Sequence, residues 1–157
     1  MSTKLRELSR ELLTSGRRLQ ELPLTIFNLA RKIKKGSLIL PDPTEIWTNE
    51  RKSEYIESIY LNYPLTWFFS EEIDDRKLLL NRGTERALAI LQYLDGSLNL
   101  TGLKILPKLE KCSFDEIHQE NGWLYNEFTE RKVLMYVSLS KLSPEENDEA
   151  VKRSLWR

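Results

Sequence analysis

Short apolar runs typical of strands are mixed along this chain with stretches of helical period, and this mixture limits the folds open to it. The apolar runs lie at residues 37–40, 65–69, 77–80, 103–106 and 133–137. Between them, apolar residues recur every three or four positions, but the two patterns do not alternate strictly. A doubly wound parallel sheet would require that alternation. We therefore expect an α+β fold, in which a small mixed β-sheet is packed with helices.

Capping residues and helix breakers locate the expected helices. Thr25 precedes a helix that Gly36 ends, and Thr48 or Asn49 precedes a second helix that ends before Pro64. The remaining helices are expected over 84–94, around 123–128 and, from a capping box at 143–146, toward Trp156.

An amphipathic helix is expected within residues 1–20, ahead of a single domain at residues 21–157. Leu5, Leu8 and Leu12 recur at helical spacing among charged residues, and Ser15-Gly16 is expected to end this helix. Such a stripe needs an apolar partner, which is either the domain itself or another protein chain. The sequence stops soon after the last helix begins to show an apolar face, as in a domain cut from a longer protein.

Composition excludes some classes of protein without choosing a function. Hydrophobic residues make up 40% of the 157 positions, which is enough to fill one core. Basic and acidic residues balance at 24 each, so any phosphate-binding surface must be a local patch. The sequence shows no signal-like or membrane-spanning stretch, and its single cysteine, Cys112, cannot form an internal disulfide. We therefore expect a cytoplasmic protein with no membrane partner.

The passage from Leu78 to Ile90 reads as a strand, a glycine and a helix. A glycine at a helix start lets backbone N–H groups approach a phosphate, and an arginine one turn later can clamp its oxygens. Gly83 and Arg86 have this spacing. Residues 83–86 also suit an ordinary strand-to-helix turn with a solvated arginine. The choice between a phosphate site and a plain turn therefore depends on the neighbouring sequence.

The neighbouring sequence resembles the N-terminal domain of GmrSD-type restriction proteins. The resemblance runs from about Leu22 to the C-terminus and is carried, in order and spacing, by 37–41, Trp47-Thr48, 52–59, Tyr63-Pro64 and 83–90. It implies a ParB/sulfiredoxin-like fold in which a Gly-x-x-Arg element at a helix N-terminus holds nucleotide phosphates. It also implies NTP-dependent, restriction-associated action on DNA in phage defence, with an NTP as cofactor and DNA or a nucleotide as partner.

Two departures from the family pattern change what the resemblance implies. The family's Asp-Gly-x-Gln-Arg motif aligns with residues 82–86, where Arg82 replaces the acid and Glu85 the glutamine. An arginine cannot ligate Mg²⁺ or act as a base at neutral pH, so no metal is predicted. The family's Phe-Gln-Arg segment is also shortened here, to residues 44–46 without a basic side chain. We therefore expect a catalytically degenerate binding module, with an electropositive phosphate site formed by Arg82, Gly83, Thr84 and Arg86.

Two alternatives remain open at this point. Glu85 could replace the lost acid in an active NTP-dependent DNA endonuclease domain, although Arg82 or Lys77 would tend to neutralise it. Alternatively, the domain acts by protein contact alone, docking through the stripe of Leu5, Leu8 and Leu12.

The other residues that could carry chemistry are expected to be structural. His118, the only histidine, excludes a multi-histidine metal site and is expected in a surface loop. Cys112 lies beside Lys111 without an acid or base placed to activate it. Trp47 and Trp67 are expected in the core or lining a groove.

Two charge clusters also have plain explanations. Four basic residues within 31–35 complement a helix dipole, or contact phosphate if they share a face with Arg82 and Arg86. The acids Glu71, Glu72, Asp74 and Asp75 are expected at a solvated hairpin tip rather than around a metal.

Overall fold

The computed structural model describes residues 2–14, 19–74 and 76–139, together with Glu145, Glu149, Lys152 and Arg153; side chains are described outside 12–14. Of the predicted capping box at 143–146 only Glu145 is described, and most of the predicted last helix lies outside the described residues. So do Ser15-Gly16, the Leu12 side chain and Asp75.

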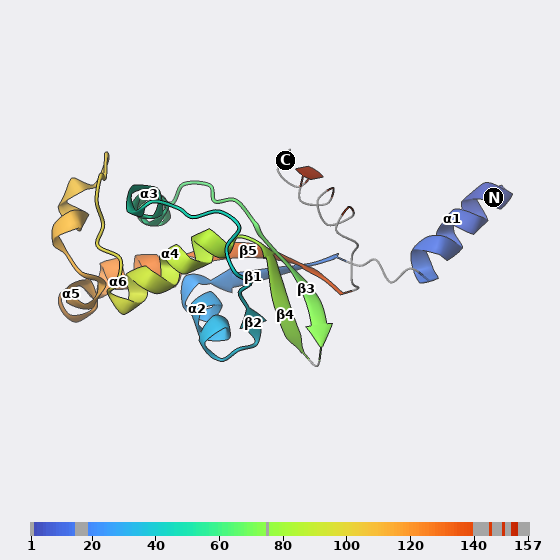
Figure 1. Cartoon of the computed structure of the whole chain (residues 1–157), viewed down its shortest axis with the longest axis horizontal. Helices are drawn as coiled ribbons and strands as arrows, with labels where there is room; N and C mark the ends of the chain where they lie inside the picture. The colour runs from blue at the N-terminus through green and yellow to red at the C-terminus, as the bar shows by residue number, and fades with distance from the viewer. Residues whose placement is uncertain are drawn as a thin grey trace.

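One mixed sheet forms the centre of the molecule, as Figure 1 shows. Its strands are β1 (Leu19–Thr25), β2 (Leu38–Ile39), β3 (Phe68–Asp74), β4 (Lys77–Arg82) and β5 (Lys132–Ser138). The order across the sheet is β1-β5-β3-β4-β2. The pairs β1–β5 and β3–β4 are antiparallel, whereas β3–β5 and β2–β4 are parallel. This mixed sheet with its helices confirms the predicted α+β class.

Six α-helices accompany the sheet in the described part of the chain. They are α1 (Thr3–Thr14), α2 (Ile26–Lys34), α3 (Asn49–Tyr60), α4 (Thr84–Asp95), α5 (Phe114–Glu120) and α6 (Gly122–Thr129). A short 3₁₀ helix, η1 (Pro107–Lys111), precedes α5. Two predicted caps are confirmed: the Thr25 hydroxyl accepts from the Asn28 N–H at 3.0 Å, and the Thr48 hydroxyl accepts from the Arg51 N–H at 3.2 Å. None of the described helices has the length and apolar character needed to cross a bilayer.

An aromatic cluster joins α3, α4, α5 and α6 in the core. Tyr60, Tyr93, Phe114 and Phe128 lie with neighbouring ring centroids 5.1 to 6.2 Å apart. The Tyr60 and Tyr93 hydroxyls share a hydrogen bond of 2.8 Å, so each polar tip has a partner inside the apolar cluster. Fully buried aliphatic side chains extend the core onto the sheet: Ile26, Leu29, Leu38, Ile56, Leu80, Ile90 and Met135.

The predicted strand at Leu103 to Leu106 is wrong. This segment is irregular, and side-chain carboxylates take the place of a neighbouring strand. The Leu103 N–H donates to Glu110 at 2.7 Å, and the buried Glu57 accepts from the N–H groups of Ile105 and Leu106 at 3.0 and 2.8 Å. Leu103 is buried and Leu106 packs against the core, whereas Ile105 is 51% exposed. The segment has no ladder of backbone hydrogen bonds, which apolar content alone cannot reveal.

Three further expectations are corrected by the structure. The strand predicted from Leu65 begins at Phe68 and continues through the acids to Asp74, which pairs with Lys77. The acids at 71, 72 and 74 therefore belong to β3 rather than to a hairpin tip. His118 lies in helix α5 rather than in a loop, and its exposed ring stacks on Tyr125 with centroids 4.2 Å apart. Strand β1 was not predicted, although it pairs with β5 along its whole length.

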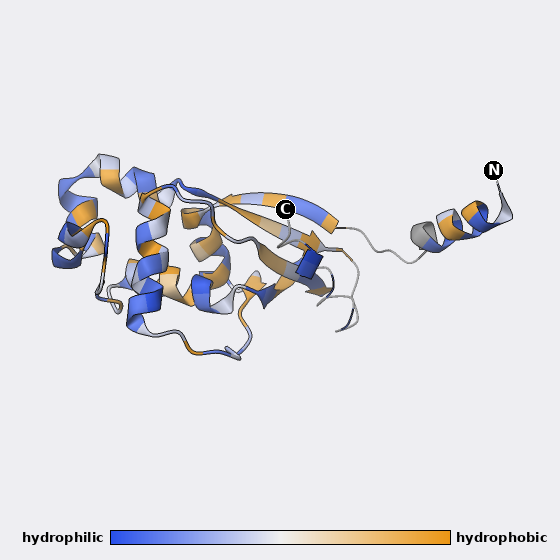
Figure 2. Cartoon of the chain, turned by 90° about the horizontal axis from the view of Figure 1, so that it is seen from above, coloured by the Kyte–Doolittle hydropathy of each residue, from blue (hydrophilic) through white to orange (hydrophobic). Residues whose placement is uncertain are grey.

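Helix α1 stands apart from the sheet, at the opposite end of the molecule from α5 and α6 (Figure 1). Its apolar and polar residues alternate with helical period, as Figure 2 shows by hydropathy. Leu5 and Leu8 are 53% and 49% exposed. A helix with amphipathic character is therefore present at residues 3–14, and the two described leucines of its stripe are half exposed.

Candidate functional site

A cavity of about 490 Å³ lies where the start of α4 meets the loop before α3 and the start of β3. Its lining includes Arg82, Gly83, Thr84, Glu85 and Arg86. The structure therefore brings every predicted phosphate-site residue, and the candidate acid, to the wall of a single cavity.

Gly83 is required by the close approach of two elements. Its backbone φ is +111°, in the region that favours glycine. A Cβ at this position would lie 2.5 Å from Cδ1 of Phe68, a side chain with no exposed surface. Gly83 is the N-cap of α4, where no side chain caps the helix, and its carbonyl accepts the first helical bond from the Ala87 N–H. The preceding N–H groups of Thr84 and Glu85 therefore have no acceptor within the helix.

The Arg86 guanidinium is hydrogen-bonded to backbone carbonyl oxygens instead of being solvated. It donates to the carbonyl oxygens of Thr66 and Trp67, the latter at 3.0 Å, and lies over the Phe68 ring at 4.6 Å from the centroid. Burial lowers the pKa of Arg86, and nearby Tyr55 partly opposes that effect. Arg86 thus fastens the start of β3 to α4, so only part of its donor set remains for a ligand.

Tyr55 and Arg131 extend this polar centre and were not expected from the sequence. The buried Tyr55 hydroxyl has no hydrogen-bond partner in the described part, and burial raises its pKa to about 12 against the influence of Arg86 and Arg131. Arg131 donates to the carbonyl oxygens of Ile59 and Tyr63 at 3.2 and 2.7 Å, near the end of α3. No local motif marks Arg131, because its hydrogen bonds join segments about 70 positions apart in sequence.

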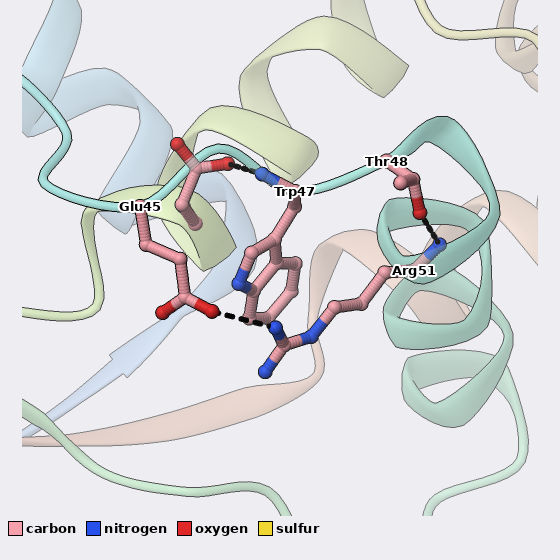
Figure 3. A network of polar contacts seen from close by, with 5 residues as sticks. Glu45, Trp47, Thr48 and Arg51 are labelled. Atoms are coloured by element: carbon pink, nitrogen blue, oxygen red, sulfur yellow. Dashed lines mark hydrogen bonds and ion pairs between the residues drawn. The ribbon is translucent and has the colours of Figure 1, made fainter.

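Glu85 holds the loop on the other side of the cavity. It is buried, and its Oε2 accepts from the Trp47 N–H at 3.0 Å. Figure 3 shows the labelled Trp47 with its N–H bonded to a carboxylate, together with the Arg51–Glu45 ion pair, whose atoms are 2.9 Å apart. The Arg51 guanidinium also lies 4.3 Å from the Trp47 ring centroid. The ion pair is largely exposed and contributes little to stability, whereas the buried Glu85 contact fixes the loop.

The formal charges around the cavity balance. Three arginines line it, namely Arg51, Arg82 and Arg86. Three carboxylates line it as well: Asp42, Glu45 and Glu85. The expected electropositive character is therefore absent from the cavity as a whole. An anion would be favoured only locally, at the exposed Arg82 and the start of α4.

The remaining candidates are dispersed. Trp47 and Trp67 both line the cavity, which confirms their groove-lining alternative. Cys112 is exposed at the end of η1. Within the described ranges, no three side chains of the His, Cys, Asp or Glu type are placed to hold a metal ion together.

The basic run of α2 does not reach this cavity. Arg31, Lys34 and Lys35 line a separate cavity near Leu94, at the opposite end of α4 from Arg86. The basic run and the residues at 82–86 therefore do not form one phosphate-binding surface.

Comparison of the chain with protein-family models, with curated proteins and with solved structures finds no match.

Proposed function

We propose that this chain is a catalytically degenerate relative of the GmrSD N-terminal domain that binds the phosphates of a nucleotide at the start of α4. The observation that carries the proposal is the cavity wall at 83–86. There, a glycine in the left-handed region opens a helix whose first N–H groups have no side-chain cap. The resemblance of the sequence to restriction proteins supports a DNA-associated role in phage defence.

The residues at 82–86 have two different roles in the proposed site, direct contact with phosphate and positioning of the facing wall. The N–H groups of Thr84 and Glu85 and the exposed Arg82 guanidinium would donate hydrogen bonds to the phosphate oxygens. Arg86 acts as a positioning residue, because it fastens the segment at 66–67 that forms the facing wall. A cavity of about 490 Å³ is within the usual size for a small-molecule ligand.

The contacts of Glu85 favour binding over catalysis. One of its carboxylate oxygens accepts from the Trp47 backbone, and its neighbour Arg82 cannot act as a base. The endonuclease alternative would require this buried carboxylate to react through its other oxygen or to leave the contact with Trp47. We therefore propose that an NTP is bound without turnover.

Titration of fluorescently labelled ATP, GTP and CTP tests the binding proposal. Arg82→Gln removes an exposed, charge-assisted contact and should weaken affinity roughly tenfold to a hundredfold, the equivalent of about 1.5 to 3 kcal/mol. Arg76→Gln, at the exposed turn between β3 and β4, is the matched control and should bind as wild type does. No binding by wild type, or the same affinity in both variants, would contradict the proposal.

Incubation with each NTP, Mg²⁺ and plasmid DNA tests the degenerate character. We expect no phosphate release and no nicking. Turnover that disappears in Glu85→Gln would instead establish the endonuclease alternative.

A second candidate function, docking to another protein through α1, is favoured by the half-exposed Leu5 and Leu8. Sedimentation velocity of the intact chain and of Leu5→Ser/Leu8→Ser, alone and with candidate partners, tests it. Loss of a complex in the variant supports docking. Equal sedimentation coefficients for the two chains in every mixture would contradict docking through α1.

A further inference from the structure

A second cavity, of about 490 Å³, combines cations with aromatic rings at the end of the molecule away from residues 82–86. Helix α2 supplies one wall, with Phe27, Arg31, Lys34 and Lys35. The facing wall comes from α5 and α6, with Phe114, Asp115, His118 and Tyr125 among the lining residues.

The charge of this cavity differs from that of the first. Arg31, Lys34 and Lys35 are all exposed, and Asp115 is the only carboxylate in the lining. The lining therefore carries a formal excess of two positive charges in a chain whose total charge is zero. Outside the lining, hydrogen bonds from Ser97 and, to a smaller extent, the charge of Lys34 lower the pKa of Asp95, so this carboxylate offsets part of that excess.

The helix dipole does not account for these cations. A helix C-terminus has the equivalent of about half a negative charge, which one cation offsets. Arg31, Lys34 and Lys35 form no ion pair with any residue in the described ranges. They remain available to an anionic ligand.

Flat apolar surfaces lie beside the cations. Phe27 is 50% exposed on the same wall, and the His118 ring stacks on Tyr125 with an interplanar angle of 14° on the facing wall. Exposed aromatic rings beside a row of cations are the combination that binds single-stranded nucleic acids, because bases stack on the rings while phosphates contact the cations.

We propose that this second cavity is a groove that binds a segment of single-stranded nucleic acid. A base stacks on Phe27, and neighbouring phosphates contact Arg31, Lys34 and Lys35. The groove lies outside the proposed nucleotide site, so the two proposals can succeed or fail separately. Contacts made to backbone and base faces give little sequence preference.

Fluorescence anisotropy with a labelled oligo(dT) strand, its duplex with oligo(dA), and labelled dTMP tests the proposal. We expect the single strand to bind more tightly than the duplex or the mononucleotide. Three phosphate contacts would give a slope of log affinity against log salt of about −2. Lys34→Gln/Lys35→Gln should reduce that slope by about 1.4, because each single-strand contact contributes about 0.7.

Variants separate stacking from general charge. Phe27→Ala should weaken strand binding about fivefold or more without changing the salt slope. Lys104→Gln/Lys108→Gln removes two exposed lysines elsewhere and should bind as wild type does. Thermal unfolding of each variant checks that the fold is retained. The proposal is overturned by absent strand binding, by equal or tighter duplex or dTMP binding, by no effect of Phe27→Ala, or by an equal loss in the Lys104/Lys108 control.

Discussion

Replacing Gly83 by alanine probes the packing on which the candidate site depends. Two separate penalties act on this methyl group. The backbone at Gly83 has φ +111°, which costs an alanine about 1 to 2 kcal/mol. The new Cβ would also lie 2.5 Å from Cδ1 and 2.9 Å from Cε1 of Phe68, which is fully buried and cannot turn aside. Overpacking of this kind costs about 1 to 3 kcal/mol, so we expect a loss of about 2 to 5 kcal/mol.

Gly96 provides a matched control at the other end of the same helix. Its φ is +84°, but a Cβ there would meet no atom within 4 Å. Gly96→Ala should therefore cost only the backbone penalty of about 1 to 2 kcal/mol. The difference between the two variants isolates the contact with Phe68.

Urea unfolding followed by circular dichroism measures both free energies of unfolding. The reasoning predicts that Gly83→Ala is the less stable variant by about 1 to 3 kcal/mol. A double-mutant cycle with Phe68→Leu should show coupling, because the smaller side chain relieves part of the clash. Equal destabilisation at positions 83 and 96, or no coupling to position 68, would refute the close-approach argument.

Two further predictions concern the buried groups Glu57 and Tyr55. Glu57→Gln should lower the free energy of unfolding by about 1.5 to 3 kcal/mol, because the bonds from the Ile105 and Leu106 N–H groups lose their charge assistance. The exposed Glu54→Gln should change it little in the same urea titration. Burial raises the Tyr55 pKa from 10.0 to about 12, so its neutral form contributes about 2 to 3 kcal/mol that is complete below pH 10 and lost as the pH rises to 12. Urea midpoints from pH 8 to 12 should therefore fall less in Tyr55→Phe than in wild type, and parallel curves would contradict this assignment.

Much of the architecture was predictable because helix caps and apolar periodicity are local signals. Thr25 and Thr48 mark helix starts in the sequence and cap those helices in the structure. Strand β1 was missed because it is an edge strand containing Pro23 and several exposed side chains, which resembles a linker.

The false strand at 103–106 illustrates the opposite limit. Leu103 and Leu106 pack toward the core and Ile105 is half exposed, but carboxylates of Glu57 and Glu110 accept from the N–H groups of this segment in place of a neighbouring strand. Glu57 is about 50 positions away in sequence, so no local pattern predicts this arrangement.

The candidate site shows the same division between local and distant signals. The spacing of Gly83 and Arg86 located a helix start with an adjoining cavity. It did not reveal that Arg86 binds the carbonyl oxygens of Thr66 and Trp67, or that Glu85 holds the Trp47 backbone. Those partners are 19 to 38 positions away and are brought close only by the completed fold.

Amide chemical-shift mapping during titration of the ¹⁵N-labelled chain with ATP tests the central claim most directly. If phosphates bind at the start of α4, the largest changes should occur at Gly83, Thr84 and Glu85, with saturation and with the loss of affinity expected in Arg82→Gln. Amides of α2, including Lys34, should change much less because they line the other cavity. Saturable changes centred on α2, or no saturable change at 83–85, would contradict a nucleotide site at this helix.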